Sequence, residues 1–227
     1  MTVDPTSNNF KENAKKALAD ENLQAALNNL KGGLISKRKE AIKRLPEFDA
    51  ISTRAKNIKD EVLLDLDFYL EKFEKKTIEY GGVVHWAEDA NDAKNIILKL
   101  LKSINAKIMT KGKTLISEEI GLNEFLEENG IEPVETDLGE YIVQIAGEKP
   151  SHIIAPALHK TKENVADLFH EIHSPLGYKE RKNSASDLVA EARSVLRKRY
   201  LEADAGLTGA NFLVAETGST AIVTNEG

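Results

Sequence analysis

Two patterns of hydrophobic and polar positions divide the chain. Up to about residue 80, apolar residues recur every three or four positions, for example at Leu23, Leu27 and Leu30. This spacing predicts amphipathic helices. Beyond that point, short apolar runs alternate with helical patterns, which predicts strands separated by helices. We therefore expect a helical N-terminal extension over residues 1–80 and an α/β domain over residues 81–227.

Short apolar runs predict the strands of the second part. They are VVHWA at 83–87, AKIMT at 106–110, IEPVET at 131–136, SHIIAP at 151–156, FLVA at 212–215 and a last run at 221–223. Strands joined by helices form parallel pairs with right-handed crossovers. Continuous apolar runs such as HIIA and FLVA are typical of strands with both faces covered. The last two runs are too close together for a crossover, so we expect an open, mostly parallel sheet that ends in an antiparallel hairpin.

Residues typical of helix ends lie between the predicted strands. Small polar side chains cap helix N-termini, and glycine ends helices because it adopts a positive φ without strain. The predicted N-caps are Asp89, Ser117, Asp137 and Thr161, and the predicted closing glycines are Gly130 and Gly147.

Composition narrows the possible functions. The chain has 227 residues, a net charge of −6 and no cysteine. The negative net charge argues against a nucleic-acid partner, because proteins normally bind the phosphate backbone with a concentrated basic face. Without cysteine, these residues cannot form disulfides or hold a zinc–thiolate site or an iron–sulfur cluster. No apolar stretch reaches the length of a membrane span or a signal peptide, so we expect a cytoplasmic protein.

The first candidate site follows the predicted strand at 106–110. The sequence GKT at 112–114 resembles the end of a phosphate-binding loop, but Lys107 occupies the place of the motif's first glycine, so a nucleoside-triphosphate site is excluded. Lys111 and Lys113 stand beside the helix that Ser117 is expected to cap. A helix N-terminus attracts anions, so this stretch is either an anion-binding site or a solvated basic loop.

Histidines supply a second candidate. His159 and Lys160 lie between a predicted strand end and a helix start, where they either contact a ligand or serve as loop residues bonded to backbone. His170 and His173 are three residues apart. The metalloprotease helix needs a spacing of four, so we predict a polar helix end and no metal site.

The closing stretch GLTGANFLVAETGSTAIV supplies the third candidate. Glu216 follows a predicted buried strand, which would raise the pKa of its carboxyl group, or it bonds to the amides of its own tight turn. Gly218 is expected to have a positive φ in that turn, and Gly206 and Gly209 to allow close approaches that side chains would block. We predict one pocket for a small anionic metabolite at the carboxyl ends of the strands. Its catalytic residues are Glu216 and His159, and its substrate-binding residues are Lys113, Ser117, Lys160, Asn211, Thr217 and Gly218.

Two long segments carry a resemblance. SEEIGLNEFLEENGIEPVETDLGEYIVQIAGEKPSHIIAPALHKT and EADAGLTGANFLVAETGSTAIVTNEG resemble the LUD-domain family, in the branch of the iron–sulfur proteins of lactate utilisation. The resemblance implies a fold like that of the sugar-phosphate isomerases and CoA-transferases. It also implies a multi-subunit system that oxidises L-lactate to pyruvate in the bacterial cytoplasm. In that family a ferredoxin-like region holds 4Fe-4S clusters, so we expect this chain to stop before that region and to carry no cofactor.

Two other classes of function stay open from the sequence. One is a stand-alone enzyme of the sugar-phosphate isomerase or CoA-transferase type, in which Glu216 would be compared with the glutamate nucleophile of the CoA-transferases. The other is a structural scaffold without a working pocket. The resemblance favours the subunit of a lactate-oxidising system, in which this part binds the substrate or the other subunits.

Overall fold

The chain forms two compact units in the computed structural model, which describes residues 6–30, 33, 35–152 and 155–223. The first unit combines the N-terminal residues up to Leu27 with Ala87–Gly209. The second combines Asn28–Trp86 with the closing residues from Ala210 onward. The sequence predicts a boundary between two domains at residue 80, and this domain boundary stays a prediction.

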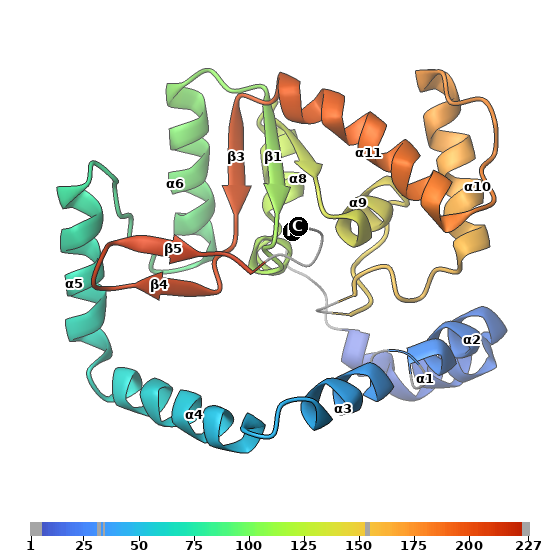
Figure 1. The fold of residues 1–227 in the computed structure, drawn as a ribbon. Coiled ribbons are helices and arrows are strands. Elements are labelled where there is room, and N and C mark those ends of the chain that lie inside the picture. The colour runs from blue at the N-terminus through green and yellow to red at the C-terminus, as the bar shows by residue number, and fades with distance from the viewer. Residues whose placement is uncertain (1–5, 31–32, 34, 153–154, 224–227) are drawn as a thin grey trace. The chain divides into compact units, whose positions relative to one another are not determined.

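A parallel sheet forms the centre of the first unit. Its strands are β1 (Ile108–Gly112), β2 (Glu132–Glu135) and β3 (Ala205–Thr208), in the order β2-β1-β3, with both pairs parallel (Figure 1). The strands expected at 106–110 and 131–136 are confirmed. The strand β3 was not predicted, because its sequence AGLT has no apolar run.

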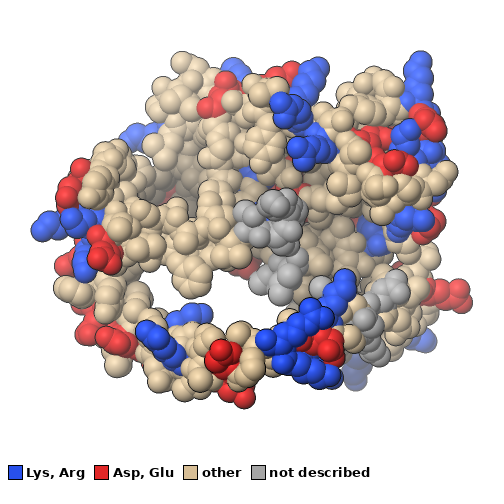
Figure 2. Space-filling model, viewed as in Figure 1, with Lys and Arg blue, Asp and Glu red and all other residues tan. Residues whose placement is uncertain are grey.

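The helices of the first unit come from three stretches of the chain, before, between and after the first two strands of the sheet. They are α1 (Phe10–Ala19) after the short 3₁₀ helix η1 (Thr6–Asn9), α2 (Glu21–Leu30, whose last turn belongs to the second unit), α6 (Ala90–Ser103), α7 (Ile116–Glu119), α8 (Leu122–Glu128), α9 (Leu138–Ile145), α10 (Lys162–His173) with η3 (Ser174–Leu176), and α11 (Ala185–Glu202). Acidic and basic side chains are interspersed over the helices on the face that Figure 2 shows.

Two apolar clusters show that both faces of the sheet are covered. One joins Val134 of β2 to α9, α10 and α11, with Phe169 and Leu196 among its buried members. The other joins Met109 of β1 to α6 and α8, with Leu126 at its centre. Burial on both faces is the arrangement expected of a parallel sheet in an α/β unit, so the predicted fold class is confirmed.

The helix ends follow the predicted residues in part. Asp89 accepts hydrogen bonds from two amides of α6, and Thr161 forms a reciprocal capping box with Asn164 at the start of α10. The predicted cap at Ser117 is wrong, because Ser117 lies inside α7 with its hydroxyl bonded to Thr114 and Lys111. Asp137 occupies the predicted N-cap position of α9, but its carboxylate makes no cap bond to that helix.

The second unit contains helices and a hairpin. Its helices are α3 (Ser36–Lys43), α4 (Phe48–Leu64) and α5 (Leu66–Glu79), and its strands are β4 (Phe212–Val214) and β5 (Ser219–Ala221). The strands pair antiparallel, which confirms the predicted hairpin, and they form a sheet of their own. Gly218 has the expected positive φ of 69°, and its carbonyl accepts a hydrogen bond from Thr77 of α5.

Three strand predictions have other outcomes. The strand predicted for VVHWA at 83–87 is wrong, since these residues follow α5 without strand pairing. FLVA forms β4, but the expected cover on both faces is wrong, because Phe212, Leu213 and Val214 are all exposed. The core of SHIIAP, residues 153–154, lies outside the described residues.

Candidate functional site

Lys111 and Glu135 bring opposite charges together at the carboxyl ends of two neighbouring strands. They are partners in the register of β1 and β2, so their side chains project from the same face of the sheet. Side chains alternate between faces along a strand, which places Lys111 on the face of Met109, against α8. The carboxyl end of a parallel sheet is where α/β folds usually place ligands.

The ammonium group of Lys111 is fully buried and surrounded by oxygen atoms that accept its hydrogen bonds. Its Nζ atom lies 2.6 Å from Glu135 Oε1 and 2.7 Å from Ser117 Oγ, and it also contacts Glu118. Asn123 of α8 donates hydrogen bonds to Glu135, at 3.0 Å, and to Glu118, at 3.4 Å. One ammonium group therefore faces two carboxyl groups, and all three of its protons are used. We call these five residues the Lys111 cluster.

The Lys111 cluster is able to exchange a proton near neutral pH. Burial raises the pKa of Glu135 to about 7, although Lys111 and Asn123 favour the charged form of its carboxyl group. A carboxyl group of this pKa is partly protonated at neutral pH and acts as either a general acid or a general base. Glu135 is held in place by its own backbone, whose amide donates to Gln144 of α9 at 2.9 Å.

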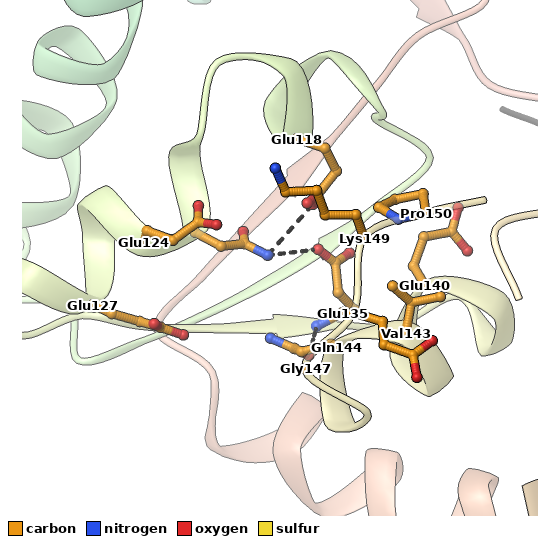
Figure 3. Close-up of a pocket in the computed structure, with 12 residues that line it drawn as sticks. Glu118, Glu124, Glu127, Glu135, Glu140, Val143, Gln144, Gly147, Lys149 and Pro150 are labelled. Carbon is orange, nitrogen blue, oxygen red and sulfur yellow. Dashed lines mark hydrogen bonds between the residues drawn. The ribbon is translucent and has the colours of Figure 1, made fainter. Parts of the chain in front are cut away.

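A pocket of about 290 Å³ opens beside the Lys111 cluster (Figure 3). The side chains that line it come from α7, α8, β2, α9 and the loop after α9. They are Glu118, Asn123, Glu124, Glu127, Glu135, Glu140, Val143, Gln144, Gly147, Glu148, Lys149 and Pro150. Figure 3 labels Glu118 and Glu135, the two glutamates of the Lys111 cluster, within this lining. Both accept hydrogen bonds from Asn123. The titratable carboxyl group of Glu135 therefore faces a cavity.

The charge of this pocket differs from that of the pocket predicted from the sequence. Six glutamates and one lysine line it, which repels an anion and attracts a cation or a basic surface. The pocket predicted for a small anionic metabolite involves other residues and stays a prediction.

Two of the predicted substrate-binding residues belong to this region: Ser117 is a member of the Lys111 cluster, and Lys113 follows Lys111 by two residues. Lys113 has a positive φ of 57° and pairs with Asp137, with 2.8 Å between Nζ and Oδ1. Gly209 lies so close that an added Cβ would stand 2.0 Å from the Lys113 carbonyl oxygen, so the close approach predicted there is confirmed. The one predicted at Gly206 is wrong, since an added Cβ there would make only an ordinary contact, 3.7 Å from Thr110 Oγ1. The interpretation of Lys111 as part of a solvated loop is wrong, because this residue belongs to β1 and is buried.

His159 and Lys160 meet at one carboxylate. His159 Nε2 lies 2.6 Å from Glu148 Oε2, and Lys160 contacts the other oxygen of the same group. The hydrogen bond from Lys160 is the main cause that lowers the pKa of Glu148, and the bond from His159 adds to it. Glu148 lines the acidic pocket, so both predicted residues are connected to its edge through this glutamate.

The other predicted residues belong to the second unit and bond within their own hairpin. Asn211 accepts a hydrogen bond from the Val223 amide at 2.7 Å, and Thr217 accepts one from Ser219 at 3.4 Å. Glu216 lies in the turn between β4 and β5, where it is exposed, so the expected burial of its carboxyl group is wrong. Its catalytic role, like that of His159, stays a prediction.

A buried polar chain in the first unit was missed by the sequence analysis. His173 is fully buried, so its description as part of a polar helix end is wrong. Its two ring nitrogens lie 2.8 Å from the Tyr141 hydroxyl and 2.8 Å from Glu191 Oε1. Burial raises the pKa of Tyr141 to about 12, so this hydroxyl keeps its proton at neutral pH. The chain lies inside the cluster of α9, α10 and α11 and has a structural role.

The described residues contain neither a metal-binding group nor a helix that could span a membrane. No group of three or more His, Cys, Asp and Glu residues within them is able to hold a metal ion. No helix in the same part of the chain combines the length and the apolar content that crossing a bilayer requires.

Comparisons with known proteins give consistent matches. The family model of the LUD domain matches residues 70–227. Lactate utilization protein B of Bacillus velezensis is 44% identical, and that of Bacillus subtilis 42% identical, each over 96% of this chain and 45% of the relative. The uncharacterized electron transport protein YkgF of Escherichia coli is 36% identical over 100% of this chain and 47% of its own length. The chain thus spans about half the length of these relatives, and no solved structure matches it.

Proposed function

This chain belongs to the LUD domain family, and on that premise we propose that it is the α/β part of a protein that takes part in the oxidation of L-lactate to pyruvate. The protein acts in the cytoplasm as a subunit of a complex, together with the other components of a lactate-utilisation system. The observation that carries this proposal is the match along 96% of the chain to proteins named lactate utilization protein B.

Electron transfer is assigned to another part of the system. The name of the Escherichia coli relative supports a link to electron transport. Iron–sulfur clusters are held by cysteine thiolates, and this chain has no cysteine, so its residues do not fit a cluster. Its contribution is therefore to bind the substrate or the other subunits.

The acidic pocket supports binding of another subunit rather than of lactate. Lactate is an anion at neutral pH, and the glutamates that line the pocket oppose its carboxylate. A basic surface of another subunit would be attracted to the same side chains. In this role Glu135, with a pKa of about 7, adjusts the charge of the pocket to the pH around it.

A chimeric protein tests the proposed function. The matching segment of Bacillus subtilis lactate utilization protein B is replaced by this chain, in a strain that lacks the native gene. We expect growth on L-lactate as the sole carbon source to be restored, because the two segments are 42% identical. A chimera that accumulates to the native level without restoring growth contradicts the proposal.

Charge reversal at the pocket tests the role in subunit binding. Glu124→Lys with Glu127→Lys should reduce both growth on L-lactate and the recovery of the other components with the chimera. The control is Glu163→Lys with Glu171→Lys, which makes an equal charge change at exposed positions of α10. Equal behaviour of the two double variants would assign the pocket no part in subunit binding.

A further inference from the structure

A long apolar groove runs along α11 in the first unit. Two adjoining hollows form it, of about 270 and 590 Å³, which share Leu138 and Val189 in their linings. Its lining on α11 extends from Ala185 to Leu201, which at 1.5 Å per residue is a length of about 24 Å. We call this feature the α11 groove.

Two arginines stand at the wider end of the α11 groove. Arg193 and Arg197 are one helical turn apart, line the larger hollow and are exposed. Neither forms an ion pair or a hydrogen bond with another described residue. Figure 2 shows Lys and Arg side chains gathered over α11. The groove therefore combines an apolar floor with two guanidinium groups that are available for carboxylates.

The complementary surface occurs in the same sequence, at the junction of α4 and α5. Residues 60–71, DEVLLDLDFYLE, contain five acidic residues and no basic one. Leu63, Leu64 and Phe68 are exposed to 66%, 84% and 58%, at or near the break between the helices. Glu61, Asp65, Asp67 and Glu71 form no side-chain ion pair within the described part of the chain. We call this segment the acidic corner.

We propose that the α11 groove of one copy of this chain binds the acidic corner of a second copy. The leucines and Phe68 fill the apolar floor, and the flanking carboxylates of Asp65 and Asp67 pair with Arg193 and Arg197. Paired guanidinium and carboxylate groups at a rim set the orientation of an interface, while the apolar contacts supply most of its stability.

Each copy carries both surfaces, and the proposal pairs them reciprocally. In a two-fold symmetric dimer the groove of each copy receives the corner of the other, and the interface forms twice. The proposal commits to a dimer and goes beyond the proposed function, which names only other subunits.

Complementary charge reversals test the pairing on the full chain. The groove variant carries Arg193→Glu and Arg197→Glu, and the corner variant carries Asp65→Lys and Asp67→Lys. Sedimentation velocity over a range of concentrations gives the dimer dissociation constant of each variant and of an equal mixture. All four positions are exposed, and circular dichroism checks that both variants keep their helices.

We expect each variant alone to raise the dimer dissociation constant by at least about tenfold, because like charges face each other at the rim. In the mixture, both interfaces of a mixed dimer pair opposite charges, so dimers should return. A control with Lys99→Glu and Lys198→Glu makes the same charge change as the groove variant outside the groove lining and should dimerise like the native chain.

Two results would overturn the proposal. One is a native chain that stays monomeric at all concentrations. The other is a mixture that dimerises no better than its separate components, which would mean that some other surface holds the dimer together.

Discussion

The two units of this protein differ in what their apolar side chains contact. In the first unit, helices cover both faces of a parallel sheet, and Phe169 and Leu126 are almost completely buried. In the second, α3, α4 and α5 have no buried residue within the described part of the chain. Helical periodicity alone is therefore a poor guide to burial. The first unit has an internal core, whereas the apolar side chains on α3, α4 and α5 of the second unit stay at least partly exposed.

A matched pair of phenylalanine truncations gives the largest expected contrast. Phe169→Ala should lower the free energy of unfolding of the first unit by about 3–5 kcal/mol, because it leaves a cavity in a packed core. Phe68→Ala should change that of the second unit by less than about 0.5 kcal/mol, since its ring is exposed. Hydrogen exchange measured by mass spectrometry resolves the two units. A comparable loss in both would show that the second unit has a core of its own.

Two lysines extend the contrast to charge. Lys111→Met should lower the free energy of unfolding of the first unit by about 3–5 kcal/mol, because Glu135 and Glu118 lose the ammonium group that faces them. Lys56→Met in α4 should lower the free energy of unfolding of the second unit by less than about 1 kcal/mol, since the ion pair between Lys56 and Asp60 is exposed. Adding Glu135→Gln to Lys111→Met should recover part of the loss. Failure of this rescue would trace the cost to lost packing rather than to charge.

The pH dependence of stability should differ between the units. The pKa of Glu135 is raised from 4.5 to about 7 in the folded protein, so the folded state binds this proton more tightly than the unfolded state. Its contribution is full below pH 4.5 and is lost as the pH rises through 7, with a slope of at most about 1.4 kcal/mol per pH unit. Glu135→Gln should remove this slope from the amides of the first unit. Hydrogen exchange between pH 5 and 8, corrected for intrinsic rates, measures this slope. An unchanged slope in the variant would show that other titratable groups cause the pH dependence.

Helix caps give the smallest expected difference. Thr161→Ala should destabilise α10 by about 1 kcal/mol, because the Asn164 amide loses the side-chain oxygen that accepts its hydrogen bond. Glu47→Ala at the start of α4 should have an effect below about 0.5 kcal/mol, since Glu47 makes no cap bond there. Exchange rates of the first-turn amides measure both effects. If the first-turn amides of α10 exchange at the same rate in Thr161→Ala as in the native chain, the Thr161 cap adds nothing to the stability that packing gives α10.

Local signals explain which elements were predicted from the sequence. Asp89 and Thr161 cap their helices as expected, because no competing charged group takes their oxygens. Ser117 and Asp137 do not, since Lys111 and Lys113 bind them instead. These competitors stand beside the predicted caps only in the folded sheet, so propensity at a single position does not reveal them.

The candidate site was harder to predict than the fold. The pairing of Lys111 with Glu135 depends on the register of β1 and β2, which no local pattern contains. One signal was present: a charged residue stands at the end of each of the two predicted strands, Lys111 directly after AKIMT and Glu135 near the end of IEPVET, and the charges are opposite. The exposure of β4 could not be predicted, because FLVA has the composition of a covered strand.

The position of the chain's single tryptophan has a practical consequence. Trp86 belongs to the second unit, is exposed and donates a hydrogen bond to Glu74 of α5. Its fluorescence therefore reports on the surroundings of α5 and is silent about the sheet. Five tyrosines, by contrast, include the buried Tyr141 beside His173. Selective excitation of the indole thus offers an optical readout of one half of the molecule without any added dye.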